Sequence, residues 1–431
     1  MRAFHRGLLA VIGGAAITTA LAQEPPPTNL TLAEAKAFAL RNNPRIRSAD
    51  SNTQAAESVV KEVRAARFPT VSAIETGVEA QHSTILAAGT LQTSSLYSRL
   101  ASGISVSQLV TDFGRTARLT QSADLRRQAQ RSQSQTVREQ VLLQVEQAYF
   151  QALSGNAART VAQAAVTSRQ TTLRQIRSLA ENAMRSTLDV RFAEVALSQA
   201  QLDLYQTENL AAEAQANLSA VLGLDHSMEF TLTDEPTPAA LEARPDSRIQ
   251  DALHKRPEVL ALTRIRDADR RYAEAEARLK LPTVSLLGAA GAVPLGDPRL
   301  PENYSAAGVN ITIPVFNGGL FSARRAEAEQ RVLAADSDLR ALSIQVSREV
   351  RVAWLEANTA ARRLDVTARL VVEAREALRL AQTRYDAGLG GIVELTQAQL
   401  NQTSAEIQNA TARYEYLSRR AALDYSSGGL Q

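Results

Sequence analysis

The sequence predicts a mainly α protein with a small β part, built from two copies of the same half. Three observations predict this: an internal repeat, two very long runs without helix breakers, and four short segments of alternating hydrophobicity. The repeat is visible where Leu40–Pro44 matches Leu253–Pro257 and Arg67–Ser72 matches Lys280–Ser285 at the same offset. Its period far exceeds the roughly 20–50 residues of a solenoid unit. Each half has the order short helix, strand hairpin, very long helix, long helix.

Residues 1–22 have the pattern of a secretory signal peptide. Arg2, His5 and Arg6 give a basic start, an apolar stretch follows, and Ala20-Leu21-Ala22 is a small-residue cleavage site. A membrane anchor is the alternative, but the apolar stretch is too short for one. The chain has 0 cysteines, which excludes both a disulfide framework and a lipid-modified cysteine.

The composition excludes several classes of partner. The 431-residue chain has a net charge of +3, with basic and acidic residues interspersed. This pattern is typical of a solvated helical surface and argues against nucleic acid as a partner. Aromatic residues make up 4% of the chain, too few for a base-stacking platform. After the signal, no run reaches the roughly 18 apolar residues of a membrane-spanning helix.

The pattern divides the mature chain into two repeats. The first, residues 23–222, has a strand hairpin at about 69–110 and a long helical hairpin at about 115–222. The second, residues 249–425, has a strand hairpin at about 282–315 and a helical hairpin at about 319–425. The proline-containing segment 223–248 predicts a linker with little regular structure, and residues 426–431 predict a flexible tail.

Two runs predict helices of unusual length. Arg115 to Leu179 contains no proline and one glycine, Gly155, and the matching run from Leu320 to Tyr385 contains neither. About 66 helical residues span on the order of 100 Å. Small or apolar residues recur along the second run in steps of three and four, which predicts a coiled-coil-like stripe. A short break and another helix follow each run, so each half ends in an antiparallel helical hairpin with a tip.

The four alternating segments are about ten residues long. In the first, Ile74, Val78 and Ala80 share one face, and Glu75 and Glu79 lie on the other. In the second segment, the apolar positions are Leu100, Ile104, Val106 and Val110. In the fourth segment, they are Val309, Ile311, Ile313 and Val315. The connections near 81–96 and 293–303 are expected to be polar loops.

Ten alternating residues suit a strand that crosses a bilayer at a tilt. A soluble sheet packed on the helices is the alternative, but its apolar face would need a cover and the helices are committed to one another. Four strands cannot close a barrel, because open sheet edges are not tolerated in lipid. If these strands lie in a membrane, several chains must share one barrel.

Taken together, these features resemble the TolC-type outer-membrane efflux proteins. The resemblance includes the duplication, the Asn43–Ile46 helix start, the Phe-Pro and Leu-Pro strand entries, the Phe316–Gly319 exit and the Gly390–Leu395 tip. It covers about residues 30–425. The resemblance implies a homotrimer with a twelve-stranded outer-membrane barrel and a twelve-helix periplasmic tunnel. It also implies a passive export duct for small molecules, metal ions or proteins, with a periplasmic adaptor and an inner-membrane pump as partners.

The resemblance also assigns roles at the helical tips. Glu394 occupies an acidic ring position at the pore constriction, Asp189 is its counterpart in the first repeat, and Gln397 stands where a second acid is common. Tyr385 and Asp189 match residues of the closing contacts, and Gly390 replaces the arginine that often accompanies them. Restoring that arginine by Gly390→Arg is expected to tighten the closed tip. The alternative for Glu394 is an ordinary solvated acid in the first turn of a helix.

Further roles follow for the adaptor and the barrel. The adaptor-facing tips are residues 183–185 and 387–389, namely Ala183, Met184 and Arg185, and Ala387, Gly388 and Leu389. Glu75 and Glu79 are expected to face the barrel lumen, because acids are costly on the lipid side.

No feature of the sequence predicts chemistry. The four histidines, His5, His82, His226 and His254, are scattered, and no nucleophile–base arrangement is visible. We therefore expect no enzyme activity, cofactor or metal. The competing function is a periplasmic coiled-coil adaptor or structural protein without membrane strands. It leaves the four alternating segments without a purpose.

Overall fold

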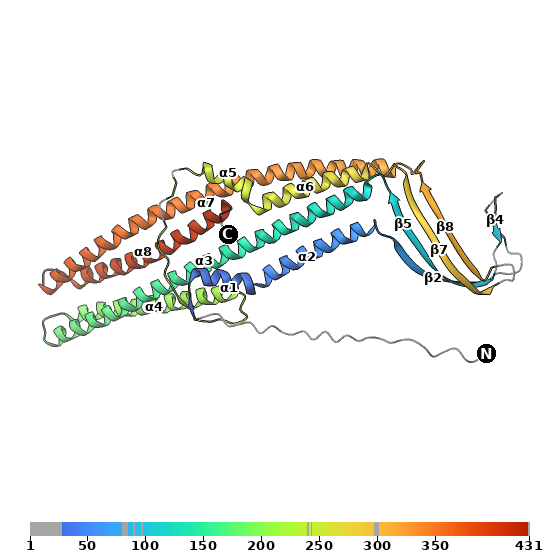
Figure 1. Ribbon diagram of the computed structural model, residues 1–431. Coiled ribbons are helices and arrows are strands. Elements are labelled where there is room, and N and C mark those ends of the chain that lie inside the picture. The colour runs from blue at the N-terminus through green and yellow to red at the C-terminus, as the bar shows by residue number, and fades with distance from the viewer. Residues whose placement is uncertain are drawn as a thin grey trace, which may run out of the picture.

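The computed structural model describes residues 28–79, 85–88, 91–95, 98–238, 241–242, 244–296 and 301–429. The signal peptide expected at residues 1–22 lies outside these ranges. The molecule is elongated, with long helices at one end and a sheet at the other (Figure 1). In the described part of the chain, no helix combines the length and the apolarity that a membrane crossing requires.

The two repeats have matching helices. In the first they are α1 Leu32–Asn42, α2 Pro44–Ala65, α3 Arg115–Glu181 and α4 Thr187–Leu222. In the second they are α5 Asp246–Lys255, α6 Pro257–Glu276, α7 Leu320–Asp386 and α8 Ile392–Ser426. The helices α3 and α7 are both 67 residues long, which confirms the expectation from the two uninterrupted runs. Each begins after a glycine with positive φ, Gly114 at 88° and Gly319 at 84°, where a side chain would be strained.

The main core lies between α1, α3 and α4. Phe38, Tyr149 and Leu218 belong to one buried cluster there. The Tyr149 hydroxyl lies 2.9 Å and 2.6 Å from the carbonyl oxygens of Leu30 and Thr233. These contacts hold two short parallel strands, β1 Asn29–Leu30 and β6 Thr231–Leu232, against α3.

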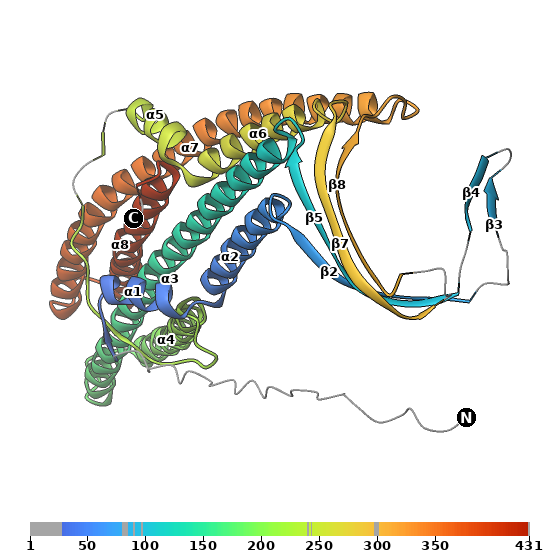
Figure 2. The same cartoon turned by 45° about the vertical axis from the view of Figure 1, so that its right-hand side comes forward.

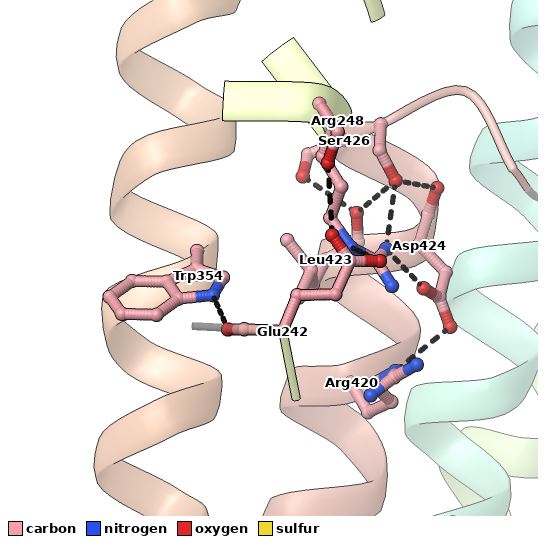
Figure 3. A network of polar contacts seen from close by, with 9 residues as sticks. Glu242, Arg248, Trp354, Arg420, Leu423, Asp424 and Ser426 are labelled. Atoms are coloured by element: carbon pink, nitrogen blue, oxygen red, sulfur yellow. Dashed lines mark hydrogen bonds and ion pairs between the residues drawn. The ribbon is translucent and has the colours of Figure 1, made fainter. Parts of the chain in front are cut away.

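The described part of the segment between the repeats, 223–238, 241–242 and 244–248, has little regular structure, as the sequence predicted. It contains β6, and α5 begins at Asp246. Figure 3 shows two contacts between this segment and the second helical hairpin. The Trp354 indole donates to the Glu242 carbonyl at 3.1 Å, and Arg248 pairs with Asp424 at 2.8 Å. Ser426 and Ser427 are buried, so they belong to the packed structure and not to a tail.

The sheet has four antiparallel strands in the order β2-β5-β7-β8. Their bounds are β2 Thr70–Val78, β5 Arg99–Thr111, β7 Thr283–Gly296 and β8 Asn303–Thr312. The central pair β5–β7 joins the two repeats, and the whole sheet is curved (Figure 2). The strands β2 and β8 are its two edges.

Two strand predictions need correction. Strand β8 ends at Thr312, because Pro314 has no N–H to continue the ladder, so Ile313 and Val315 lie beyond it. The connection near 81–96, expected as a loop, contains the two-stranded pairing of β3 Ile85–Ala88 with β4 Leu91–Ser95. Residues 80–84, 89–90 and 96–97 of that connection lie outside the described residues.

The register shows which residues of β5 share a face with Glu75. Glu75 pairs with Ser102, and Ala73 pairs with Ile104. Directly opposite residues share a face of the sheet, as do alternate residues along a strand. Glu75 therefore lies on the same face as Ile104, not opposite the apolar residues of β5. The Ser102 hydroxyl lies 3.5 Å from Glu75 Oε1. The sequence could not reveal which residues of β5 share a face with Glu75. Alternation within one strand separates its two faces, but it does not show which of them is continuous with a given face of the neighbouring strand.

Candidate functional site

The two helical tips have the same backbone geometry. Ala183 has φ 54° and Gly388 has φ 73°. The next residue in each tip donates a 6→1 hydrogen bond: Met184 N to Leu179 O at 2.9 Å, and Leu389 N to Arg384 O at 2.8 Å. This is the Schellman pattern of helix ends. The structure therefore aligns Ala183-Met184 with Gly388-Leu389.

Ala183→Gly is expected to stabilise the first tip by about 1 kcal/mol, because a left-handed alanine is strained by roughly that amount. The reverse change, Gly388→Ala, is the matched control and should destabilise the second tip by a similar amount. Thermal unfolding of the purified protein measures both. If neither substitution changes the unfolding temperature, the positive φ angles at Ala183 and Gly388 are not maintained in solution.

Each tip presents one large apolar side chain to solvent. Met184 is 63% exposed and Leu389 is 73% exposed. Ala183, Ala387 and Gly388 beside them are also exposed. Apolar side chains at the ends of long polar helices are typical of a protein-contact surface. The structure thus places five of the six expected adaptor-contact residues where a partner could reach them.

Tyr385, expected in the gate, is buried behind the tips. It is 3% exposed and packs with Leu173, Ile176 and Leu395. Burial raises the pKa of its hydroxyl, and the nearby charge of Asp189 raises it further. The hydroxyl has no hydrogen-bond partner among the described residues. Tyr385 and Asp189 are thus near each other, and no hydrogen bond joins the Tyr385 hydroxyl to a described residue of the same chain.

Arg185 contacts Tyr385 instead of projecting into solvent. Its guanidinium carbon lies 4.2 Å from the centroid of the Tyr385 ring, and its Nη2 donates to the Tyr385 carbonyl oxygen. This pairing joins the first-repeat tip to the end of α7 in the second repeat. The sequence interpretation placed Arg185 at the adaptor surface and found no arginine for the gate. No sequence signal links two residues so far apart.

Glu394 has an arginine partner of its own. Arg384 Nε lies 3.1 Å from Glu394 Oε1, with both side chains about half exposed. Glu394 and Asp189 each lie in the first turn of a helix, where an acid is favoured by the helix dipole. Gln397 donates to Asn401 Oδ1 at 2.9 Å. The tip acid is therefore partly neutralised.

The space around Gly390 is tight within one chain. A Cβ there would lie 3.2 Å from Arg384 Cβ, 3.2 Å from Glu394 Oε2 and 3.3 Å from Tyr385 N. A side chain there would require these neighbours to shift by a few tenths of an ångström, and the tightening effect of Gly390→Arg stays a prediction. Two other arginines lie beside the predicted gate residues: Arg185 contacts Tyr385, and Arg384 pairs with Glu394.

The remaining predicted residues lie elsewhere. Glu75 is on β2 and Glu79 directly follows it, at the end of the molecule opposite the tips (Figure 1). Among the described residues, no group of three or more His, Asp or Glu side chains could hold a metal ion.

Two pairs of long helices with apolar tips, joined to a small curved sheet with two open edges, define the class of duct-forming envelope proteins (Figure 2). A family model described as outer membrane efflux protein matches residues 38–224 and 248–429. The chain belongs to this family and is an outer-membrane efflux channel protein with a long periplasmic part. The match covers both repeats and leaves out most of the segment between them.

Relatives of known name agree along nearly the whole chain. Protein CyaE of Bordetella pertussis is 27% identical, with 94% of this chain and 86% of that protein covered. Outer membrane protein TolC of Vibrio cholerae is 25% identical, with 90% and 88% covered. Outer membrane protein OprJ of Pseudomonas aeruginosa is 26% identical, with 86% and 78% covered.

Solved structures have the same fold. The outer-membrane channel OprN superposes with a TM-score of 0.78 at 21% identity, covering 92% of this chain and 90% of that one. The CusC structure superposes with a TM-score of 0.76 at 18% identity, covering 95% and 96%.

Proposed function

We propose that three copies of this chain form one passive exit duct, with a shared twelve-stranded barrel and a helical tunnel. The open edges of the four-stranded sheet carry this proposal. In a membrane, each unpaired N–H and C=O of β2 and β8 would cost several kcal/mol. Because successive strands alternate in direction, β8 of one copy runs antiparallel to β2 of the next. Repeating that contact around an axis closes a ring without leaving an edge.

Cysteine cross-linking tests the shared barrel, and the chain has 0 native cysteines to interfere. One cysteine on β2 and one on β8, scanned in register, should give disulfide-linked dimers and trimers in outer-membrane vesicles. The control pair Thr76→Cys and Ala101→Cys joins opposite positions of β2 and β5 and should link only within a chain. A monodisperse monomer in lipid nanodiscs, with no cross-linked ladder, would overturn the proposal.

The tips define the other end of the duct. We propose that Met184 and Leu389 dock a periplasmic adaptor, and that the duct works with an inner-membrane pump in tripartite efflux or type I secretion. Apolar side chains that are more than half exposed support this, because they gain most from being covered by a partner. Two of the relatives named above, TolC and OprJ, are outer membrane proteins. The same tips would serve either kind of system.

Glu394→Gln is expected to lower the cation preference of the duct. Three copies of Glu394 in a narrow protein-walled pore would focus a negative potential, although each is partly neutralised by Arg384. The reversal potential across a salt gradient measures the change. Glu376→Gln is the control, because Glu376 is an exposed acid of α7 that pairs with Arg379. An unchanged reversal potential in the Glu394 variant rejects the ring role.

Glu75→Leu is expected to stabilise the assembled protein by about 1 kcal/mol per chain. The register places Glu75 on the face of Ile104, and a charge costs energy on a lipid-facing surface. Thr76→Leu changes the opposite face and serves as the control. Thermal unfolding in nanodiscs compares the two. If Glu75→Leu has no effect or destabilises the protein, the original lumen placement of Glu75 is supported.

A further inference from the structure

A groove lies between the two helical hairpins, several turns behind the tips. It has a volume of about 230 Å³ and is walled by α3, α4 and α8. Phe192, Val195 and Leu400 form its apolar walls, and all three are substantially exposed. The groove thus combines side chains from both repeats, with α3 and α4 on one side and α8 on the other.

A buried arginine lines this groove. Arg169 of α3 is 7% exposed, and its Nη2 donates to Thr403 Oγ1 of α8 at 3.3 Å. In the described part of the chain, no carboxylate lies within ion-pair distance of its guanidinium. Burial lowers the pKa of Arg169, and no acid among the described residues opposes this. An arginine nevertheless stays charged in a protein, so the described part of the chain leaves this buried positive charge without an anion.

Another arginine of this chain, Arg256, is as deeply buried as Arg169 and has carboxylate partners. Arg256 is 6% exposed and pairs with two carboxylates, Glu258 and Glu349, the latter at 2.7 Å. An acid, Asp203, lies on the wall of this groove, where Gln199 Nε2 donates to its Oδ1 at 2.9 Å. Among the described residues, Asp203 makes no ion pair with Arg169. The contrast with Arg256 indicates that the partner of Arg169 comes from outside the chain.

We propose that this groove binds a small monocarboxylate with an apolar body, its carboxylate on Arg169 and its body against Phe192, Val195 and Leu400. The planar guanidinium matches a carboxylate, and the apolar walls match a ring or a short branched chain. The volume admits a ligand smaller than drug size. Because Arg169 and Thr403 belong to different repeats, the bound ligand holds the two hairpins together. This site goes beyond the duct function and does not depend on it.

Fluorine NMR of 4-fluorobenzoate with the full-length assembled protein in nanodiscs tests the proposal. Line broadening that unlabelled benzoate reverses is expected for the unaltered protein. Benzyl alcohol, which has the same ring without the charge, should not compete. Arg169→Gln should weaken binding about tenfold or more, since a hydrogen bond to a charged group is lost. Arg174→Gln alters another arginine of α3 that does not line the groove, and should bind as the unaltered protein does.

Two further variants separate a binding role from a structural one. Asp203→Asn removes a negative charge from the groove wall and should tighten binding, an effect that a purely structural Arg169 would not produce. Arg169→Lys keeps the charge and the fold but lacks the planar fork, so its affinity should lie between those of the unaltered protein and Arg169→Gln. Binding that is equal in Arg169→Gln, or equal for benzyl alcohol, overturns the proposal.

Discussion

Gly291→Ala is expected to abolish accumulation of the assembled protein in the outer membrane. Gly291 of β7 is directly opposite Gly103 of β5, and the Tyr304 side chain of β8 lies over both. A Cβ at Gly291 would meet the Ser102 carbonyl oxygen, and would lie 2.7 Å from Gly103 Cα and 2.6 Å from Tyr304 Oη. Two of these atoms are backbone and cannot move aside without separating β5 from β7. The cost should therefore exceed the roughly 1–3 kcal/mol of ordinary overpacking.

The control for this change is Gly308→Ala in the neighbouring strand β8. A Cβ at Gly308 would have no atom within 4 Å, so the two substitutions share their effect on the unfolded chain and differ in the clash. Membrane fractionation and thermal unfolding compare the two variants. If both accumulate and melt alike, then β5 and β7 are not as close in the membrane as the structure shows.

Arg185→Ala is expected to shift the duct strongly toward its open form. Arg185 joins the two helical hairpins through the Tyr385 ring and the Tyr385 carbonyl oxygen. A partly buried cation–π contact contributes about 0.5–2 kcal/mol, and a hydrogen bond from a charged donor about 1.5–3 kcal/mol. Losing about 2 kcal/mol changes the closed-to-open ratio roughly 30-fold. Single-channel recordings should show higher conductance or longer openings.

Arg191→Ala is the matched control, because Arg191 is an exposed arginine of α4 near the same tip and pairs only with Glu194 in the described part of the chain. It should leave the recordings unchanged. Arg185→Lys retains a cation over the ring and should lie between the two. Equal conductance in Arg185→Ala and the unaltered protein would show that Tyr385 holds the hairpins together without this arginine.

Local sequence patterns predicted most of the helical architecture. The absence of proline from Arg115 to Leu179 and from Leu320 to Tyr385 led to helices that the structure confirms within a few residues. The breaks at both tips and the four strands were also predicted. These features depend on the residues of one segment and their immediate neighbours, so periodicity and helix breakers are sufficient to locate them.

The sheet shows where such patterns fail. The alternation of β2 separates Glu75 from Ile74, and the alternation of β5 separates Ile104 from Ser105. Neither pattern states which face of β2 matches which face of β5. Only the pairing of Glu75 with Ser102 decides it, and a shift of one residue would reverse the result.

The sequence by itself determined the duplication, the lengths of the helices, the positions of the tips and the family. The tertiary structure alone decided that Arg185 lies on Tyr385, that Arg384 partly neutralises Glu394, and that Arg169 is buried with no carboxylate partner among the described residues. The physical reason is the range of the interactions. Helix and strand formation is governed by neighbours along the chain, whereas charge pairing, burial and register depend on segments that meet only after the two repeats have folded together.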